Sequence, residues 1–190
     1  VSRLCAETFK HVSLEMGGKN PMIVMDDADL DLVLAGAVWG AFGTTGQRCT
    51  ACSRVLVHEQ VHDELAGRVA ERARKLRVGD GLDPATEMGP VATDKQYDTV
   101  LSHFASAREE GADFACGGKP VERLGGWFVE PTVVVDTQPG MRVLREEVFG
   151  PVAAVQVEVA DRVSVDRLEA ECRGGVAPTQ ALPFAPAALH

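Results

Sequence analysis

The chain has 190 residues, of which 45% are hydrophobic and 25% are charged, a balance typical of a globular protein with a sizeable core. A formal net charge of −9 without any Lys/Arg run argues against a nucleic-acid-binding protein. No stretch approaches the roughly 20 apolar residues of a membrane span, and the first residues show no signal-peptide pattern. We therefore expect a cytoplasmic protein, and the missing initiator Met indicates a chain that begins within a longer protein.

Hydrophobic periodicity predicts alternating strands and helices along most of the chain. Apolar residues spaced by three or four mark the helices, and short apolar runs mark the strands. Pro131 indicates an irregular or edge strand around it. The alternation predicts an α/β fold with a largely parallel twisted sheet and flanking helices. The expected elements, in chain order, are a helix end at 3–12, strands at 12–16 and 22–25, a helix at 30–42, a strand at 54–58, helices at 59–77 and 93–110, a strand at 128–136, a short helix at 142–148 and a strand at 152–157.

The character of the chain changes after about residue 157. The last part holds Pro178, Pro183 and Pro186 among many alanines and shows no hydrophobic periodicity. We therefore expect a folded domain at 1–157 and a divergent, disordered tail at 158–190. One hypothesis for the tail is translation of a shifted reading frame or a truncated gene, which sequencing of the locus would test.

The five cysteines are sparse and odd in number, which argues against a disulfide framework. Cys49 and Cys52 form a Cys-x-x-Cys pair, but no second pair or suitably spaced His indicates zinc, so we predict no metal site. Cys52 is interpreted as a small side chain in the strand that follows. A Cys49–Cys52 disulfide formed on oxidation is an alternative hypothesis.

Cys49 is the first candidate for chemistry. It follows a Gly-containing turn between a helix end and a strand, in the segment 46–51 (GQRCTA). Such a position can expose the sulfur among backbone N–H groups, which stabilise a thiolate or a developing oxyanion. A buried structural cysteine is the competing interpretation when this segment is taken alone.

Glu15 is the second candidate. It lies in the segment 14–21 (LEMGGKNP), where two glycines allow the backbone to approach a ligand closely. A carboxylate at this position can act as a general base through water. Taken alone, the segment is better explained as a solvated glutamate beside a turn, and only its pairing with Cys49 favours a site.

The segments 14–19 and 46–49 resemble the two signature motifs of the aldehyde dehydrogenase superfamily, which carry a glutamate and a cysteine in this order and separation. A third segment, 146–152 (EEVFGPV), resembles the family's Glu-Glu-Ile-Phe-Gly-Pro segment. Residues 88–91 and 130–132 match further family positions. The resemblance covers roughly the whole expected domain and implies the catalytic-domain fold of this family in incomplete form.

This resemblance implies the oxidation of an aldehyde to a carboxylate through a thioester on Cys49, with NAD or NADP as cofactor. It implies that Glu15 activates the water that hydrolyses the thioester. Glu147 matches the residue that binds the nicotinamide ribose, and Phe149 packs nearby. Met16 matches a position whose backbone carbonyl meets the carboxamide. The parent family further implies a homo-oligomer.

The resemblance leaves the substrate and the activity of this chain open. The segment 46–51 with Ser53 and Arg54 resembles members that oxidise semialdehydes, and Arg48 beside the nucleophile would favour an acidic aldehyde. Full-length members carry a nucleotide-binding domain before the glutamate motif, and no Gly-rich phosphate loop is present here. We therefore weigh a dehydrogenase against an inactive remnant or partner-dependent subunit and against a cofactor-free thiol esterase. We also expect exposed apolar patches that favour association.

Overall fold

The computed structural model describes residues 1–159, so the expected tail lies outside the described residues from residue 160 on. Its centre is a sheet of five strands in the order β1-β2-β5-β4-β3. The first four strands in this order are parallel, and β3 pairs antiparallel with β4 at the far edge. The expected α/β fold with a largely parallel sheet is confirmed. The strands are β1 Asn20–Val24, β2 Cys52–His58, β3 Asp113–Cys116, β4 Thr132–Val135 and β5 Val152–Val159.

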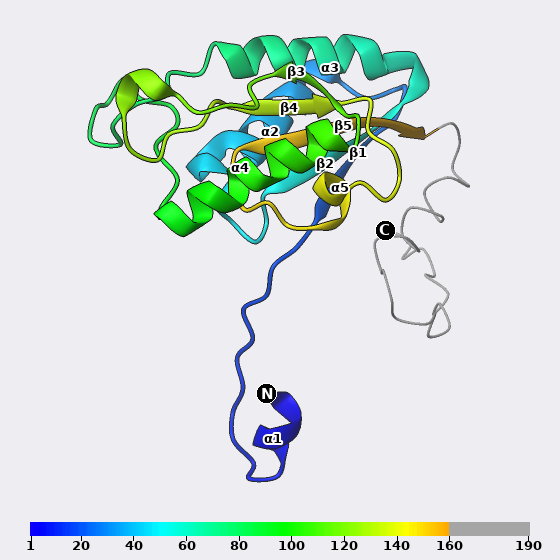
Figure 1. Cartoon of the computed structure of the whole chain (residues 1–190). Helices are drawn as coiled ribbons and strands as arrows, with labels where there is room; N and C mark the ends of the chain where they lie inside the picture. The colour runs from blue at the N-terminus through cyan, green and yellow to red at the C-terminus, as the bar shows by residue number, and fades with distance from the viewer. Residues whose placement is uncertain (160–190) are drawn as a thin grey trace.

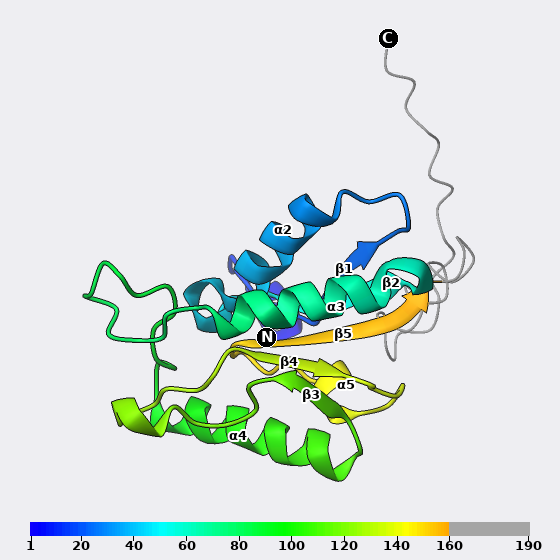
Figure 2. The same cartoon turned by 90° about the horizontal axis from the view of Figure 1, so that it is seen from above.

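Helices cover both faces of the sheet. The helices α2 and α3 lie on one face, whereas α4 and the short α5 lie on the other, as Figures 1 and 2 show. Two short 3-10 turns, η1 Gly43–Gly46 and η2 Glu122–Leu124, stand in connections between these elements. The helices are α1 Ser2–Ala6, α2 Leu30–Phe42, α3 Glu59–Arg74, α4 Asp94–Glu109 and α5 Arg142–Arg145.

The long helices begin at residues whose side chains accept backbone N–H groups. Asp29 caps α2 by accepting from the N–H groups of Asp31 at 3.0 Å and Leu32 at 3.2 Å, as the acidic segment before this helix predicts. Thr93 caps α4 in the same way by accepting from the N–H of Gln96 at 3.2 Å. Local polar side chains therefore set the start of both of these helices.

The strand β5 is buried on both faces of the sheet. Ala153 and Val155 pack against α2 and α3, while Val152 and Ala154 pack on the α4 side. This two-sided burial explains why its sequence reads as a continuous apolar run, as expected for an inner parallel strand. Each fully buried valine contributes on the order of 1.5–3 kcal/mol relative to an exposed one, so the middle of the sheet holds the two helical layers together.

Two of the expected strands are wrong in detail. Residues 12–16 are extended but belong to no strand of the described sheet, because β1 begins only at Asn20. Pro131 does not place its strand at an edge: β4 begins directly after it and pairs on both sides, with β5 and with β3. The edge strand β3 itself was not expected.

His103 is a buried polar group in α4. Its side chain is 1% exposed, and its Nδ1 has no hydrogen-bond partner within the described part of the chain. Burial and, secondarily, the positive charges of Arg142 and Lys19 lower the pKa of His103 to about 4, against the opposing effect of Glu146 and Glu110. His103 is therefore neutral in the folded protein at neutral pH.

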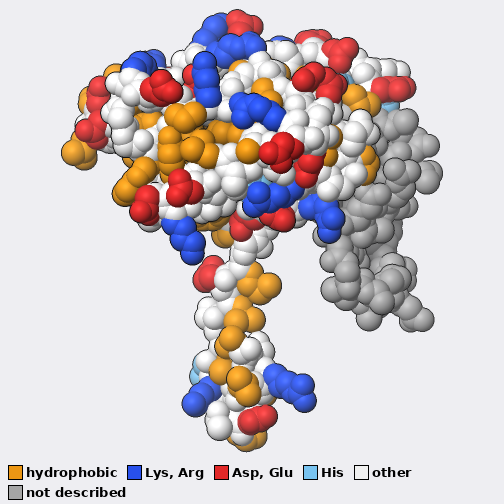
Figure 3. All heavy atoms as spheres, viewed as in Figure 1, with side chains coloured by type: hydrophobic (Ala, Val, Ile, Leu, Met, Phe, Trp, Pro, Cys, Tyr) orange, Lys and Arg blue, Asp and Glu red, His pale blue; other side chains and the backbone are white. Residues whose placement is uncertain are grey.

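The residues of the N-terminal arm, which includes α1, stand away from the body of the molecule (Figures 1 and 3). They carry exposed apolar side chains, among them Leu4 at 71%, Phe9 at 96% and Leu14 at 52% of full exposure. This arm leads directly into the segment that holds Glu15. None of the helices in residues 1–159 is both long and apolar enough for a membrane span.

Candidate active site

The topology brings the three motif segments to the same end of the sheet, at the amino ends of its strands. Residues 14–19 precede β1, residues 46–51 precede β2, and residues 146–151 precede β5. These three strands are neighbours and run in the same direction. The segments before them therefore meet at the amino ends of the strands, although about 130 positions separate the first segment from the third.

An open pocket of about 460 Å³ lies between the three segments. It is lined by all five residues that the sequence singled out, so residues from three distant segments share one cavity. Gly17, Gln47, Arg48 and Thr50 complete the lining. The five are Glu15, Met16, Cys49, Glu147 and Phe149.

The loop before Cys49 adopts a tight left-handed conformation. Thr44, Thr45 and Gly46 all have positive φ, of 54°, 57° and 65°. A Cβ atom built on Gly46 would lie 2.1 Å from the carbonyl oxygen of Gly150, a distance that no real Cβ tolerates. Glycine at position 46 is therefore required both for the turn and for the close approach of the loop before β5.

Polar side chains hold the same loop against the segment that follows residue 88. The Gln47 side-chain Oε1 accepts from the backbone N–H of Ala92 at 2.9 Å. The Thr45 hydroxyl donates to the carbonyl of Gly89 at 3.2 Å. These contacts give a structural reason for Gln47 within the motif, and they place Cys49 on the solvent side, where it is exposed.

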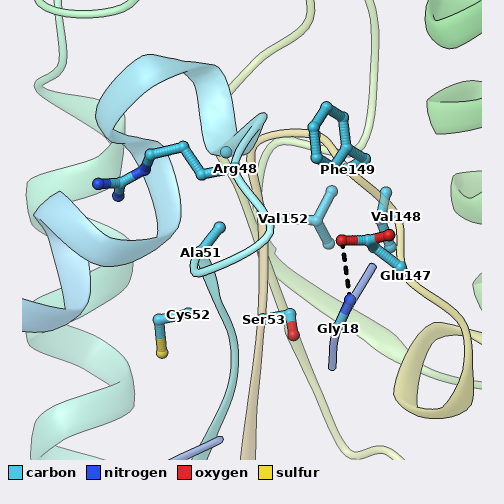
Figure 4. A pocket seen from close by; sticks show the side chains of 11 residues that line it. Gly18, Arg48, Ala51, Cys52, Ser53, Glu147, Val148, Phe149 and Val152 are labelled. Carbon is cyan, nitrogen blue, oxygen red and sulfur yellow. Dashed lines mark hydrogen bonds between the residues drawn. The ribbon is translucent and has the colours of Figure 1, made fainter. Parts of the chain in front are cut away.

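The guanidinium of Arg48 points toward α2 and away from Glu147 and Phe149 (Figure 4). It lies 3.9 Å from the centre of the Trp39 ring and donates to the carbonyls of Trp39 at 3.2 Å and Gly40 at 3.3 Å. The aromatic face and the two carbonyl acceptors hold the guanidinium at this place, although its Nε has no hydrogen-bond partner within the described residues. The expected role of Arg48 in attracting an acidic aldehyde therefore loses its geometric basis.

Cys52 has surroundings opposite to those of Cys49. It is buried in the core beneath α2, and its thiol donates to the carbonyl of Arg54 at 3.4 Å. Burial raises the pKa of Cys52 to about 11, against the opposing effect of its backbone contacts and of Lys19. This agrees with the interpretation of Cys52 as a core side chain, and its thiol is poorly suited to exchange with Cys49.

The carboxylate of Glu147 rests against the two glycines of the glutamate motif. Its Oε1 accepts from the backbone N–H of Gly18 at 3.1 Å, as Figure 4 shows. A Cβ atom built on Gly17 would lie 2.0 Å from the Oε2 of Glu147. The paired glycines therefore leave the space that the carboxylate occupies, and this contact ties the segment before β1 to the segment before β5.

Phe149 stands beside Glu147 in a strained backbone conformation. Its φ is 51°, which is uncommon for a residue with a Cβ atom, and its ring is 37% exposed. The side-chain amide of Gln96 donates to the carbonyls of Val148 at 2.8 Å and Phe149 at 2.9 Å. Gln96 thereby holds the strained loop that presents the aromatic ring, and strain of this kind concentrates at functional sites.

Lys19, the residue before β1, adds a partly buried positive charge near Glu147. Burial and, secondarily, the charge of Arg54 lower the pKa of Lys19 to about 8, while Glu147 acts in the opposite direction. Among residues 1–159, no group of three or more His, Cys, Asp or Glu side chains is arranged to hold a metal ion. The groups at the amino ends of these strands are therefore a thiol, two carboxylates, the Lys19 amine and an aromatic ring.

Comparison with known proteins identifies the family. The family model described as "Aldehyde dehydrogenase family" matches residues 1–162. The chain belongs to the aldehyde dehydrogenase family. Among curated aldehyde dehydrogenases, betaine aldehyde dehydrogenase from Brucella ovis is 46% identical over 162 residues, which cover 84% of this chain and 33% of that protein. The chain thus spans about a third of the length of the curated relatives it matches.

Solved aldehyde dehydrogenase structures share the fold. A variant of the Bacillus cereus aldehyde dehydrogenase matches 86% of this chain and 33% of its own, with 38% identity and a TM-score of 0.82. A Staphylococcus aureus betaine aldehyde dehydrogenase variant in complex with NAD+ matches 82% of this chain and 32% of its own, with 39% identity and a TM-score of 0.77. These matches confirm the resemblance on which the site residues were chosen.

Sequence reasoning missed several residues that shape this part of the aldehyde dehydrogenase fold. Asn20, Gln47 and Gln96 each use a side-chain amide to hold backbone groups of the motif loops. Asn20 directly follows the glutamate motif and Gln47 lies inside the cysteine motif, so their position was the available signal. Gln96 lies on α4, 52 positions from its nearer acceptor, and no local pattern identifies it.

Proposed function

We propose that this chain carries the reactive cysteine of an NAD(P)-dependent aldehyde dehydrogenase, which oxidises an aldehyde to a carboxylate through a thioester. The observation that supports the proposal best is the pocket of about 460 Å³ in which the thiol of Cys49 shares the cavity with Glu15 and Glu147. A nucleophile, a base and a further carboxylate in one cavity are the groups that this chemistry needs.

Cys49 is the proposed nucleophile. Its thiolate attacks the aldehyde carbon, so that a carbon–sulfur bond forms and the carbonyl electrons move to the oxygen. The backbone N–H of Cys49 is the proposed donor to this oxyanion. The exposure of Cys49 on a loop held at Gln47 supports this role, because the thiol is accessible while its backbone is fixed.

Glu15 is the proposed general base. It takes a proton from a water molecule that attacks the thioester carbon, after which the carbon–sulfur bond breaks and the carboxylate product leaves. Glu15 is exposed and lines the same pocket as Cys49. It lies at the end of the extended arm, directly before the glycine pair that Glu147 fixes.

Glu147, Phe149 and Met16 are the proposed cofactor-binding residues. The half-buried carboxylate of Glu147 can accept hydroxyl hydrogen bonds, and the exposed ring of Phe149 offers a flat apolar contact. These two features fit the ribose and ring end of NAD or NADP, and Met16 lines the same pocket. When bound, the nicotinamide supplies the hydride acceptor that the oxidation requires.

The proposed substrate is a small aldehyde without a negative charge. The pocket is lined by the two carboxylates Glu15 and Glu147, while the guanidinium of Arg48 is bound to α2. This charge balance favours a cationic or neutral aldehyde over an acidic semialdehyde. The curated relatives named betaine aldehyde dehydrogenase act on a cationic aldehyde by their name, so betaine aldehyde is the first substrate to test.

We further propose a cytoplasmic homo-oligomer. The helix α2 is apolar on its outer side as well as its inner side, with Leu32 at 73% and Trp39 at 65% of full exposure, and such a face favours association. The cysteines Cys5, Cys52 and Cys116 are free like Cys49, which suits a reducing compartment. Sedimentation of the wild type and of Leu32→Glu tests the assembly, with a single-chain mass for the wild type counting against it.

The deciding experiment is formation of NADH or NADPH by the purified chain from a panel of aldehydes. We expect betaine aldehyde to react faster than succinic semialdehyde, and Cys49→Ala to abolish the signal. Cys52→Ala is the matched control, since its buried thiol takes no part. No signal from any aldehyde in folded protein would refute the dehydrogenase.

The same preparation separates the two alternatives. Hydrolysis of p-nitrophenyl acetate that needs Cys49 and Glu15 but no cofactor would favour a thiol esterase. Absence of both activities would favour an inactive remnant or a subunit that needs a partner chain.

A further inference from the structure

Asn20 joins the glutamate segment to the cysteine segment through its side chain. It is the first residue of β1, five positions after Glu15. Its side-chain Nδ2 donates to the carbonyl of Cys49 at 2.5 Å and to the carbonyl of Ala51 at 3.2 Å. A carboxamide nitrogen has two N–H donors, and here both point at the loop that carries the nucleophile.

Fixing the Cys49 carbonyl fixes the orientation of the nucleophile. The peptide bond is planar, so a held carbonyl sets the plane between residues 49 and 50 and with it one backbone torsion of Cys49. The second contact, to Ala51, prevents the loop from pivoting about the first. The two segments also touch directly, because a Cβ atom on Gly18 would lie 3.0 Å from the carbonyl oxygen of Cys49.

The contact extends a chain of bonds through all three segments. Glu147 accepts from the N–H of Gly18, two residues before Asn20, and Asn20 in turn donates to the cysteine loop. The hydroxyl of Ser53 donates to the backbone carbonyl of Asn20 at 3.4 Å and makes a weaker link beside it. Asn20 therefore occupies the junction between the base and the nucleophile.

We propose that Asn20 is a positioning residue for Cys49, whose side-chain amide holds the nucleophile loop in register with the segment of Glu15. The inference rests on the proposed role of Cys49. Asn20 does not reach the reacting atoms itself. Its effect on the chemistry passes through the backbone of Cys49, and displacement of a nucleophile by about 1 Å can cost on the order of a hundredfold in rate.

The test compares Asn20→Asp with wild type in pre-steady-state hydrolysis of p-nitrophenyl acetate. Aspartate keeps the size of asparagine but replaces the two donors by an acceptor that repels both carbonyls. We expect the rate constant of the acylation burst, which reports attack by Cys49, to fall about tenfold or more. Asn20→Ser, which is too short to reach both carbonyls, should show the same direction and serves if the aspartate variant does not fold.

Ser53→Ala is the matched control. It removes a hydrogen bond to the same asparagine without touching the cysteine loop, and its burst rate constant should stay within twofold of wild type. The rate constant separates positioning from simple loss of structure, since partial unfolding lowers the burst amplitude and leaves the rate constant of the folded fraction unchanged.

The outcomes are distinct. A burst rate constant within twofold of wild type in folded Asn20→Asp or Asn20→Ser overturns the positioning role. An equal fall in Ser53→Ala also overturns it, because the effect would then belong to the strand start in general. A wild-type chain that shows a burst but forms no NADH refutes the proposed oxidation alone, whereas a wild type that neither hydrolyses the ester nor forms NADH overturns both.

Discussion

Substitution of Gly46 by alanine tests whether the approach of two loops supports the site. Gly46 has a φ of 65°, and an added Cβ would stand 2.1 Å from the Gly150 carbonyl oxygen and 2.8 Å from the Ala41 carbonyl oxygen. Both obstacles are backbone atoms, which cannot rotate aside as a flexible side chain can. The new methyl group must therefore separate the loop before β2 from the loop before β5.

The expected cost has two parts. The left-handed conformation costs a residue with a Cβ atom about 1–2 kcal/mol, and forced overpacking adds about 1–3 kcal/mol. Gly111 supplies the matched control, because its φ is 87° but an added Cβ would meet nothing within 4 Å. We therefore expect Gly46→Ala to lower the free energy of unfolding by about 2–5 kcal/mol and Gly111→Ala by about 1–2 kcal/mol.

Urea unfolding followed by circular dichroism measures both variants against wild type. The ester burst of Gly46→Ala should also fall in the protein that stays folded, since the same loop carries Cys49. If Gly46→Ala costs no more than Gly111→Ala, the close approach of the two loops does not exist in solution and the reasoning fails.

Three further predictions concern other parts of the molecule. Because the pKa of His103 is depressed, the unfolded chain binds a proton between pH 6.5 and pH 4 while the folded chain does not. The free energy of unfolding should therefore decrease by up to about 3 kcal/mol as the pH is lowered through this range. His103→Leu should lose this part of the pH dependence in urea titrations, and an unchanged slope would contradict it. Iodoacetamide should label the exposed Cys49 well before the buried Cys52 and Cys116, and early labelling of Cys52 would disprove its burial. Mass spectrometry after mild peroxide should find no Cys49–Cys52 disulfide. Gln96→Ala should release the loop that carries Phe149 and raise the KM for NAD about tenfold, while the rate constant of the ester burst stays unchanged. A fall in the burst rate constant alongside the rise in KM would argue against a role confined to the cofactor side.

The sequence predicted the fold best where the structure is local. Asp29 and the apolar stripe after it predict α2 to within a residue, because helix caps and periodicity depend on near neighbours. The strand β3 was missed because its four residues carry little β-branched character, and it exists only by pairing with β4. For the strand after Pro131 the edge alternative failed for a similar reason, since strand order is decided by pairings between distant segments, whereas its pairing with β3 is irregular.

The candidate site was predicted through its motifs and not through its geometry. Cys49 and Glu147 share the pocket because β2 and β5 are neighbours, a relation that no spacing in the sequence contains. The suggestion that Arg48 favours an acidic aldehyde lost its basis for the same reason, because the Trp39 ring and the carbonyls at the end of α2 hold its guanidinium. Side-chain orientation at a site depends on partners that only the folded chain brings near.

The place of β5 in the sheet has a consequence for folding during synthesis on the ribosome. It is the last of the described strands to be synthesised, yet it lies between β2 and β4. Until β5 inserts, β2 and β4 each keep an unpaired edge. During that time Glu147 and Phe149, which precede β5, are not held beside Cys49. The nascent chain thus exposes the thiol of Cys49 without the rest of the pocket and carries two unpaired strand edges that can pair with other chains. This interval is therefore the one in which a chaperone would matter most.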